Sequence, residues 1–319
     1  MILILSDCND QSTHETVDWI KHDFFILNEN THISKFSLNF TFKFSTKSFQ
    51  SLYSLLAIDY EKIESFWYRR GDFIIVLNEV IIDNKLLFSQ IYREWNVIKS
   101  FLHFTLRSKR HIGNFHKEES HNKLLDLFFA QEVGLTIPST IVSSEKTDLE
   151  NSCENSNGVI TKAISNMFEI NMPLNCQSIG TQLVEESYLN TLLKTAFPTL
   201  LQENIRKSFE LRIFYLDNQF YSMAIFSQFN QITKIDYRNG NKMRLNRNVP
   251  YILPDEITEK LKLLMLKMNL NSGSIDMIVT PEDEYVFLEV NPTGQFGWVS
   301  ENCNYYLEEK IAHCLEGRA

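Results

Sequence analysis

The scarcity of glycine limits the possible folds of this chain most strongly, because only ten glycines occur among its 319 residues. Two common nucleotide-binding folds depend on glycine-rich loops that let the backbone approach phosphate groups closely. Neither the GxGxxG pattern of dinucleotide-binding domains nor the GxxxxGK[S/T] pattern of P-loop enzymes occurs in the sequence. Neither of these two folds can therefore be assigned to the chain.

Composition describes a globular chain, with 44% hydrophobic and 22% charged residues, that is long enough for two or three subdomains. The longest apolar runs, such as Ile2–Leu5, fall far short of the roughly 18 residues that span a bilayer. The N-terminus also lacks a signal-peptide pattern, so we expect a cytoplasmic protein with no membrane partner. A net charge of −9 disfavours binding to nucleic acid.

The cysteines and histidines give no clear metal or disulfide pattern. The five cysteines are widely spaced and never form a CxxC pair, which argues against structural zinc and against a disulfide framework. Four histidines lie close in sequence, at His103, His111, His116 and His121. Steps of five residues on a helix place side chains on different faces, so we favour surface positions over a metal role for this group.

The apolar pattern predicts a mixed α/β chain with antiparallel portions. We expect strands over residues 2–5, 158–163, 200–205, 209–216, 219–227, 274–279 and 285–290. We expect helices after the capping-box pattern Ser12-x-x-Glu15, over 86–106, over 122–134, near 189–197 and after Pro254. The Asp217-Asn218 pair between two alternating segments predicts a hairpin turn. The polar segment 107–117 predicts the first domain boundary of the chain.

The most specific group of polar residues lies near the C-terminus, where Asp276 precedes a turn and Glu289 and Asn291 follow it. Alternate residues of a strand share a face, and an antiparallel neighbour can bring Asp276 beside the other two. Two carboxylates and an amide oxygen suit Mg²⁺, which nucleotide phosphates usually complete. On spacing alone, solvent-facing strand positions are an equally good interpretation.

Upstream segments occur in an order that resembles the ATP-grasp superfamily. The segments are residues 122–138, which form a helix that ends before Pro138, GVITK at 158–162, LQENI at 201–205, FELR at 209–212 and LEVNP at 288–292. The resemblance implies a mixed α/β ATP-grasp fold in three parts. These are an N-terminal α/β domain (1–115), a central subdomain with a phosphate-covering flap near 165–178 (116–200), and a C-terminal subdomain with the Mg²⁺ site (201–319), the last two clasping ATP.

The same resemblance implies residues that bind the nucleotide. Lys123 and Lys162 would bring ammonium charge to the α- and β-phosphates, where the alternative is a solvated surface lysine. The backbone from Gln202 through Glu203 to Ile205 would pair with the adenine edge, and Gln202 would add its side-chain amide. An ordinary strand end is the alternative for that segment.

Other matched positions would act on the reacting groups. Glu210 would accept hydrogen bonds from the ribose hydroxyls or face the metal, and Arg212 would be the catalytic residue that neutralises charge on the transferred phosphoryl group. An exposed ion pair between Glu210 and Arg212 is the alternative, and it would contribute under about 1 kcal/mol. Asp276, Glu289 and Asn291 would hold Mg²⁺.

Both ends of the chain resemble a narrower group, the ATP-grasp peptide maturases of the grasp-with-spasm type, which are related to the graspetide (microviridin-like) macrocyclases. The matching segments are residues 1–6, 64–71, 291–300 and 303–308. This resemblance implies a ribosomally made precursor peptide as partner, a SPASM-type partner maturase and a homodimer. Arg69, Arg70 and Gln295 are the candidate substrate contacts, although Arg69 and Arg70 would point to opposite faces of a strand, so that at most one would reach a common site.

The function that we expect is an ATP-dependent carboxylate ligase using ATP and Mg²⁺. It would activate Glu or Asp side chains of the precursor as acyl phosphates and crosslink them to Ser or Thr hydroxyls or to Lys amines. Two alternatives remain open. One is an ATP-grasp ligase that joins amino acids to a small molecule or a protein tail, and the other is a nucleotide-binding protein that escorts the precursor without catalysis.

Overall fold

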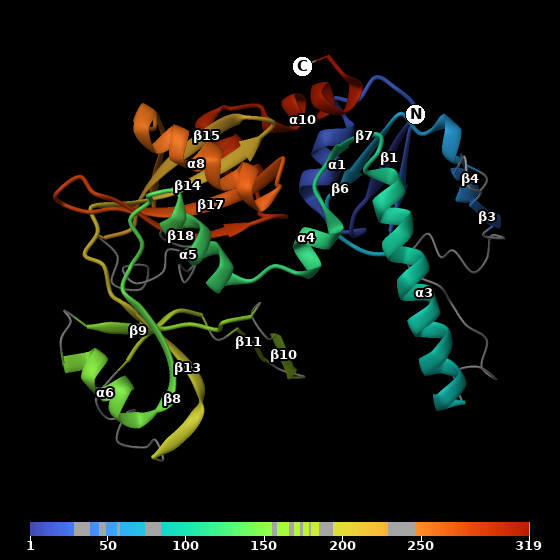
Figure 1. The fold of residues 1–319 in the computed structure, drawn as a ribbon. Helices are drawn as coiled ribbons and strands as arrows, with labels where there is room; N and C mark the ends of the chain where they lie inside the picture. The colour runs from blue at the N-terminus through green and yellow to red at the C-terminus, as the bar shows by residue number, and fades with distance from the viewer. Residues whose placement is uncertain are drawn as a thin grey trace.

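The structure, a computed structural model, describes residues 1–28, 39–44, 49–55, 58–73, 84–154, 158–165, 169–172, 175–178, 180–184, 194–228 and 246–318 (Figure 1). Its strands form one parallel sheet near the N-terminus and antiparallel sheets elsewhere. This is the mixed α/β fold that the apolar pattern predicted.

The N-terminal sheet has the strand order β2-β1-β6-β7, and all its strand pairs are parallel. Its strands are β1 (Ile2–Leu5), β2 (Phe24–Leu27), β6 (Ser65–Tyr68) and β7 (Arg110–Ile112). Strands β1 and β6 are buried throughout, which explains their uninterrupted apolar sequence. The long helix α3 (Lys85–Leu106) extends away from this sheet in Figure 1 and confirms the helix predicted over 86–106.

Helix α1 (Gln11–Val17) begins earlier than the sequence pattern suggested. Asp10 is its N-cap and accepts hydrogen bonds from the N–H and the hydroxyl of Thr13. The predicted capping box at Ser12 was therefore wrong, because an aspartate two residues earlier satisfies the helix N-terminus. Near β1, a small antiparallel sheet contains β3 (Asn39–Phe44), β4 (Phe49–Leu55) and β5 (Ile58–Asp59), and the one-turn 3₁₀ helix η2 (Tyr60–Lys62) follows it.

The central sheet has the order β12-β9-β13-β8 and is antiparallel. Its strands are β8 (Thr140–Glu145), β9 (Val159–Thr161), β12 (Gln182–Leu183) and β13 (Thr195–Glu203), and helix α6 (Lys146–Glu154) packs against it. A separate hairpin pairs β10 (Glu169–Met172) with β11 (Asn175–Ser178) inside the expected flap. Residues 166–168 and 173–174 of that flap lie outside the described residues.

The helix predicted near residues 189–197 is wrong at its C-terminal end, where β13 already begins at Thr195. Pro198 disfavours a helical conformation at the residue before it, and Phe197 is exposed, so the apolar pattern there did not mark a buried helix face. Residues 185–193, which carry the rest of that prediction, lie outside the described residues.

The C-terminal sheet has the order β16-β15-β14-β17-β18 and is antiparallel. Its strands are β14 (Phe209–Leu216), β15 (Gln219–Phe226), β16 (Arg247–Tyr251), β17 (Ser272–Val279) and β18 (Tyr285–Asn291). The predicted hairpin turn is confirmed, because Asp217 and Asn218 both have positive φ, at 42° and 66°. Helix α8 (Asp255–Met268) packs its Leu261, Leu264 and Met265 into the core on one face of this sheet.

Four further helices lie between or after the strands of these sheets in the chain. They are α4 (Phe115–Glu119), α5 (Lys123–Glu132), α9 (Gly297–Cys303) and α10 (Leu307–Glu316). One hydrophobic core contains residues of both the N-terminal and the C-terminal sheets together with α9 and α10, including Ile4, Trp67, Phe214, Ile225, Val299 and Ile311. The central sheet has only a small core of its own and lies below the C-terminal sheet in Figure 1.

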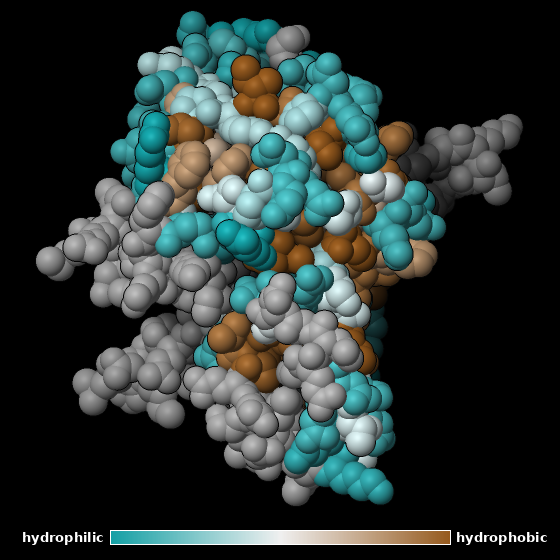
Figure 2. Space-filling model, turned by 90° about the vertical axis from the view of Figure 1, so that its left-hand side faces the viewer, coloured by the Kyte–Doolittle hydropathy of each residue, from teal (hydrophilic) through white to brown (hydrophobic). Residues whose placement is uncertain are grey.

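The surface carries scattered apolar side chains. Figure 2, which views the molecule from the left-hand side of Figure 1, shows hydrophobic residues among hydrophilic ones on this face. Helix α5 packs against β18 and α8, yet its Leu125 and Phe128 are about half exposed. No helix among the described residues is long and apolar enough to cross a membrane.

Candidate active site

A cleft lies between the central sheet and the C-terminal sheet. Its lining includes seven residues that the sequence singled out, namely Lys162, Gln202, Glu203, Ile205, Glu210, Asp276 and Glu289. They come from the end of β9, from the end of β13 and the segment after it, and from three neighbouring strands of the C-terminal sheet. The cleft therefore gathers side chains that are up to 127 positions apart, from Lys162 to Glu289.

A row of charged residues crosses the C-terminal sheet beside this cleft. Arg212 of β14 is opposite Asp276 of β17, and Asp276 is opposite Glu289 of β18. The Nη1 atom of Arg212 lies 3.0 Å from each carboxylate oxygen of Asp276, and both side chains are buried. The sequence-based expectation that an antiparallel neighbour brings Asp276 beside Glu289 is confirmed by this register.

The oxygen donors of this row fit a hard divalent cation. Asp276 and Glu289 line the cleft together, and two carboxylates are the ligand type that Mg²⁺ prefers. Asn291 lies two residues beyond Glu289, on the same face of β18 and opposite Ser274, and its Oδ1 atom accepts a hydrogen bond of 3.1 Å from the N–H of Thr293. Among the described residues, no three His, Cys, Asp or Glu side chains are grouped closely enough to hold a metal without such an amide.

Two lysine side chains, Lys123 and Lys162, lie at the cleft. The Nζ atom of Lys123, at the start of α5, lies 3.7 Å from Glu289 Oε2 and donates to the carbonyl of Ala163 at 3.3 Å. Lys162, next to Ala163 in the chain, lines the cleft. Lys123 therefore connects α5 with the end of the central sheet and with the edge of the C-terminal sheet.

The segment after β13 presents its backbone to the cleft. The N–H groups of Glu203 and Asn204 donate to the carbonyls of Ser139 and Gly158, at 2.9 and 3.0 Å. The next N–H, that of Ile205, has no hydrogen-bond acceptor in the part of the chain that the structure describes. Gln202 is 1% exposed and its Nε2 atom donates to Thr140 Oγ1 at 2.9 Å, so its side-chain amide is directed toward β8.

Glu210 is held by a lysine that the sequence analysis did not consider. Lys207 Nζ lies 2.6 Å from Glu210 Oε1, and Ser227 Oγ donates to the other carboxylate oxygen at 2.6 Å. All three side chains are buried, and Lys207 lines the cleft. The spacing of three residues between Lys207 and Glu210 was visible in the sequence, but a surface lysine is the usual expectation for such a position.

A second overlooked residue supports the strand that carries Glu289. Asp126 of α5 is 1% exposed and accepts from the backbone N–H of Val290 at 3.2 Å and from His121 Nε2 at 2.9 Å. Burial opposes the charged form of His121, but the hydrogen bond and charge of Asp126, with Glu118 and Glu289 adding, raise its pKa. Asp126 lies three residues after Lys123, so both project from one face of α5 toward β18.

Arg69 joins the N-terminal sheet to the segment that follows β18. It is 3% exposed and its guanidinium donates to the carbonyl of Thr293 at 2.5 Å and to Gln295 Oε1 at 3.1 Å. The guanidinium also lies 3.3 Å from Asp10 Oδ1 and 5.5 Å from the ring centre of Phe296. Burial lowers the pKa of Arg69 to about 10, a value at which it still carries a positive charge at neutral pH.

The prediction that Arg69 and Arg70 point to opposite faces of a strand was wrong, because β6 ends at Tyr68 and strand alternation does not extend to them. Arg69 hydrogen-bonds to Gln295, and Arg70 lines the same cavity as Gln295. Gly294 lies between these contacts and Arg212. A Cβ atom at this glycine would lie 2.3 Å from the Ser274 Cβ and 3.0 Å from Arg212 Nη2, so only glycine fits there.

No protein-family model matches this chain, and no curated protein matches it in sequence. Solved structures match it over its whole length. The parallel N-terminal sheet followed by two antiparallel sheets that face each other across a cleft is the ATP-grasp fold, and the chain has this fold.

Three of the structures that it resembles are enzymes of peptide maturation. A RiPP-associated ATP-grasp ligase of Chryseobacterium gregarium, in complex with ADP and a leader and core peptide, is 23% identical with a TM-score of 0.81, covering 100% of this chain and 97% of that one. The macrocyclase MdnC of Microcystis aeruginosa MRC, bound with precursor peptide MdnA, is 24% identical with a TM-score of 0.75, covering 99% of each chain. The ATP-grasp ligase PsnB, complexed with minimal precursor, Mg and ADP, is 13% identical with a TM-score of 0.72, covering 99% of this chain and 96% of that one.

Proposed function

We propose that this chain is an ATP-grasp ligase that acts on a ribosomally made precursor peptide. It activates Glu or Asp side chains of the peptide as acyl phosphates and joins them to Ser or Thr hydroxyls or to Lys amines, releasing ADP and phosphate. The observation that carries this proposal is the row of Arg212, Asp276 and Glu289 across three strands, in which Asp276 and Glu289 line the cleft. Peptide-maturing enzymes with the same fold support the peptide as substrate.

The proposed reaction needs positioning and charge neutralisation more than a protein nucleophile. A carboxylate is a poor electrophile, and its phosphorylation creates a good leaving group. Arg212 would neutralise negative charge on the phosphoryl group and on the acyl-phosphate oxygens. Lys123 and Lys162 would bind phosphate oxygens from two sides of the cleft. Asp276, Glu289 and Asn291 would hold Mg²⁺, which supplies further neutralisation when bound.

The other end of the cleft fits the nucleoside. The N–H of Ile205 and the neighbouring backbone of Glu203 would pair with the adenine edge. Gln202 would contribute through its backbone, since its amide is bonded to Thr140. Glu210, which Lys207 and Ser227 hold in one orientation, would accept hydrogen bonds from the ribose hydroxyls. Arg70 and Gln295 would contact the peptide beyond the Arg212 end of the cleft, and the buried Arg69 would position Gln295.

The finer assignment follows the resemblance at the two ends of the chain. We infer a cytoplasmic peptide maturase of the grasp-with-spasm type that works as a homodimer beside a SPASM-type maturase. Its three parts would be residues 1–115, 116–200 and 201–319, and the hairpin of β10 and β11 would belong to the flap that covers the phosphates.

The test is mass spectrometry of the candidate precursor peptide, encoded near the gene, after incubation with the enzyme, ATP and Mg²⁺. We expect the peptide to lose the mass of one water for each ring formed. The variants Asp276→Ala and Glu289→Ala should abolish this loss, and Glu282→Ala, in the exposed turn before β18, should not.

Two other outcomes would change the proposal. A gain of one amino acid's mass would indicate an intermolecular ligase. An unchanged peptide together with bound ATP would indicate the escort protein without catalysis.

A further inference from the structure

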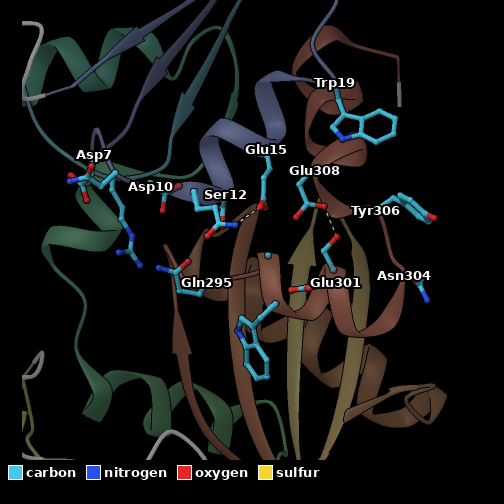
Figure 3. A pocket seen from close by; sticks show the side chains of 16 residues that line it. Asp7, Asp10, Ser12, Glu15, Trp19, Gln295, Glu301, Asn304, Tyr306 and Glu308 are labelled. Carbon is cyan, nitrogen blue, oxygen red and sulfur yellow. Dashed lines mark hydrogen bonds between the residues drawn. The ribbon is translucent and has the colours of Figure 1, made fainter. Parts of the chain in front are cut away.

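A large cavity lies outside the nucleotide cleft, at the junction of the N-terminal and C-terminal parts. It has a volume of about 960 Å³ and is open to solvent. The segment after β1 and helix α1 form one side, and α9 and α10 form the other (Figure 3). Its charged lining residues are five carboxylates and one guanidinium, namely Asp7, Asp10, Glu15, Glu301, Glu308 and Arg70. The aromatic rings of Trp19, Trp298 and Tyr306 complete the wall.

Two of these carboxylates converge on one point above Gly297. A Cβ atom built on Gly297 would lie 3.1 Å from the neutral Ser12 Oγ, 3.7 Å from Glu15 Oε2 and 3.9 Å from Glu308 Oε1. Figure 3 shows Glu15 extending from α1 and Glu308 from α10 into the cavity. Because Gly297 has no side chain, the space between the two carboxylate oxygens is left for a ligand atom.

Neutral groups fix both carboxylates in place. Gln11 Nε2 donates to Glu15 Oε1 at 2.6 Å, and Ser300 Oγ donates to Glu308 Oε2. Ser300 is itself positioned by the N–H of Leu307 at 2.9 Å. Within the part of the chain that the structure describes, no lysine, arginine or histidine pairs with Glu15 or Glu308. Asp10 differs from them, because Arg69 and Thr13 already occupy its oxygens.

The cavity adjoins the reacting end of the nucleotide cleft. Gln295 lines the cavity, and its backbone carbonyl accepts from Arg212 Nη2 at 3.2 Å. Gly297 follows two residues later. A peptide side chain held above Gly297 would therefore lie on the side of Arg212 where we place the peptide. Arg212 is the residue that we propose neutralises the acyl phosphate.

We propose that this cavity binds the lysine side chain of the precursor that attacks the acyl phosphate, so that the enzyme forms amide crosslinks in preference to esters. The inference rests on the proposed function and deepens it. Two converging carboxylates attract an ammonium group strongly, give a neutral hydroxyl no comparable advantage and repel the carboxylate that is to be activated. Aromatic rings beside the carboxylates favour the same cation and its aliphatic stem.

The ammonium nitrogen loses two protons when it becomes the nitrogen of the amide. The bound ammonium gives one proton to Glu15 or Glu308 and becomes a neutral amine. Its lone pair forms the C–N bond to the acyl carbon. The C–O bond to the phosphoryl group breaks, the phosphate leaves with that electron pair, and the second proton from nitrogen passes to the departing phosphate.

The experiment compares three synthetic versions of the precursor peptide that differ only at the acceptor position, which is Lys, Ser or norleucine. We expect the Lys peptide to lose water and to form a bond that resists mild alkali, and we expect the Ser peptide to react at least about tenfold more slowly, since a charge-assisted contact is lost. The norleucine peptide should not react.

Variants then connect the preference to the cavity. Glu15→Gln with Glu308→Gln should lower kcat/KM for the Lys peptide by about tenfold or more. Gly297→Ala changes no charge, yet its methyl group would occupy the point between the carboxylates and should have a similar effect. A matched control, Glu256→Gln with Glu259→Gln on the exposed face of α8, removes the same charge and should leave kcat/KM unchanged. Thermal unfolding of each variant shows whether it is folded.

The outcomes separate the inference from the proposed function. If the Ser peptide closes to an alkali-sensitive ester as fast as, or faster than, the Lys peptide closes, the function stands and the inference is wrong. The same holds if the Lys peptide reacts equally well with folded variants of Glu15, Glu308 and Gly297. If no version loses water with ATP and Mg²⁺, the proposed function fails and the inference with it.

Discussion

The cleft to which we assign the nucleotide and the acidic cavity differ in how their charges are compensated. In the cleft, each cation with a described contact lies beside a carboxylate of the protein, as in the pairs Lys207–Glu210, Arg212–Asp276 and Lys123–Glu289. In the cavity, the described hydrogen bonds to Glu15 and Glu308 come from the neutral side chains of Gln11 and Ser300. The two sites meet at Gln295, which contacts Arg212 and lines the cavity.

This difference follows from burial. Charges removed from water cost several kcal/mol each unless they are paired, so the buried cations of the cleft need partners in the protein itself. Glu15 is exposed and Glu308 is half-buried, so water can solvate them without a cation. A site with both signs of charge in balance suits a ligand with both signs, such as a nucleotide with its metal, whereas a site with five carboxylates and one guanidinium favours a cation.

The largest effect should follow from breaking a pair in the cleft. Asp276→Asn leaves Arg212 as a buried charge without a compensating carboxylate and removes a proposed metal ligand. We expect the free energy of unfolding to fall by about 3–5 kcal/mol. Crosslinking should fall by about 100-fold or more. Denaturant unfolding and mass spectrometry measure the two effects. Glu282→Gln, which removes one exposed carboxylate, is the control, and equal stability of the two variants would contradict the pairing argument.

A smaller effect is expected at the edge of the cleft, where Lys123 is partly exposed. Lys123→Met removes one proposed phosphate contact and should raise the KM for ATP by about tenfold with little loss of stability. Lys146→Met on α6, which breaks an exposed pair with Glu150, is the matched control. If both variants have the same KM for ATP, Lys123 does not bind phosphate.

The cavity should respond to salt because its carboxylates face water. The Debye length falls from about 10 Å at 0.1 M salt to about 3 Å at 1 M. We expect the ratio of dissociation constants between the norleucine and the Lys peptide to shrink by about threefold over this range. Calorimetry on the wild type and on Glu15→Gln with Glu308→Gln measures it, and a constant ratio in the wild type would argue against a cation site.

The smallest effect concerns His121, which supports the cleft from behind. Burial lowers the pKa of His121, but the hydrogen bond and the charge of Asp126 outweigh this effect, so the pKa is raised in the folded protein. The stability that His121 contributes is therefore present below its unfolded pKa of about 6.5 and is lost as pH rises through the folded pKa. In metal-free buffer, the urea concentration at the unfolding midpoint of the wild type should fall as pH rises above about 6.5, and it should fall less in His121→Gln. His313→Gln on α10 should keep the full decline, and an identical decline in both variants would contradict the assignment.

Sequence reasoning succeeded where the determining contacts are local or follow a strand period. The alternating segment around Asp217-Asn218 predicted its hairpin, and the spacing of Glu289 and Asn291 predicted a shared face beside Asp276. The ordered segments from 122 to 292 predicted the ATP-grasp fold. Each of these features depends on neighbours in sequence or on one strand pairing.

It failed where distant residues determine the outcome. Arg69 contacts Asp10, 59 positions before it, and Gln295, 226 positions after it, and no local pattern relates these three residues. The acidic cavity forms only when α1 and α10 lie side by side, and no local pattern relates Glu15 to Glu308. Asp126 was overlooked for the same reason, because its importance comes from the N–H of Val290.

The core shared by the N-terminal and C-terminal sheets has a mechanical consequence. Arg69 also hydrogen-bonds across the two parts, to Thr293 and Gln295, so the N-terminal and C-terminal sheets are packed as one unit. The central sheet has only a small core of its own and joins the C-terminal sheet through the segment from Asn204 to Lys207, so we expect it to move about that segment. Opening and closing for ATP would then leave the geometry of the acidic cavity unchanged, so the enzyme could hold its peptide through several rounds of nucleotide exchange.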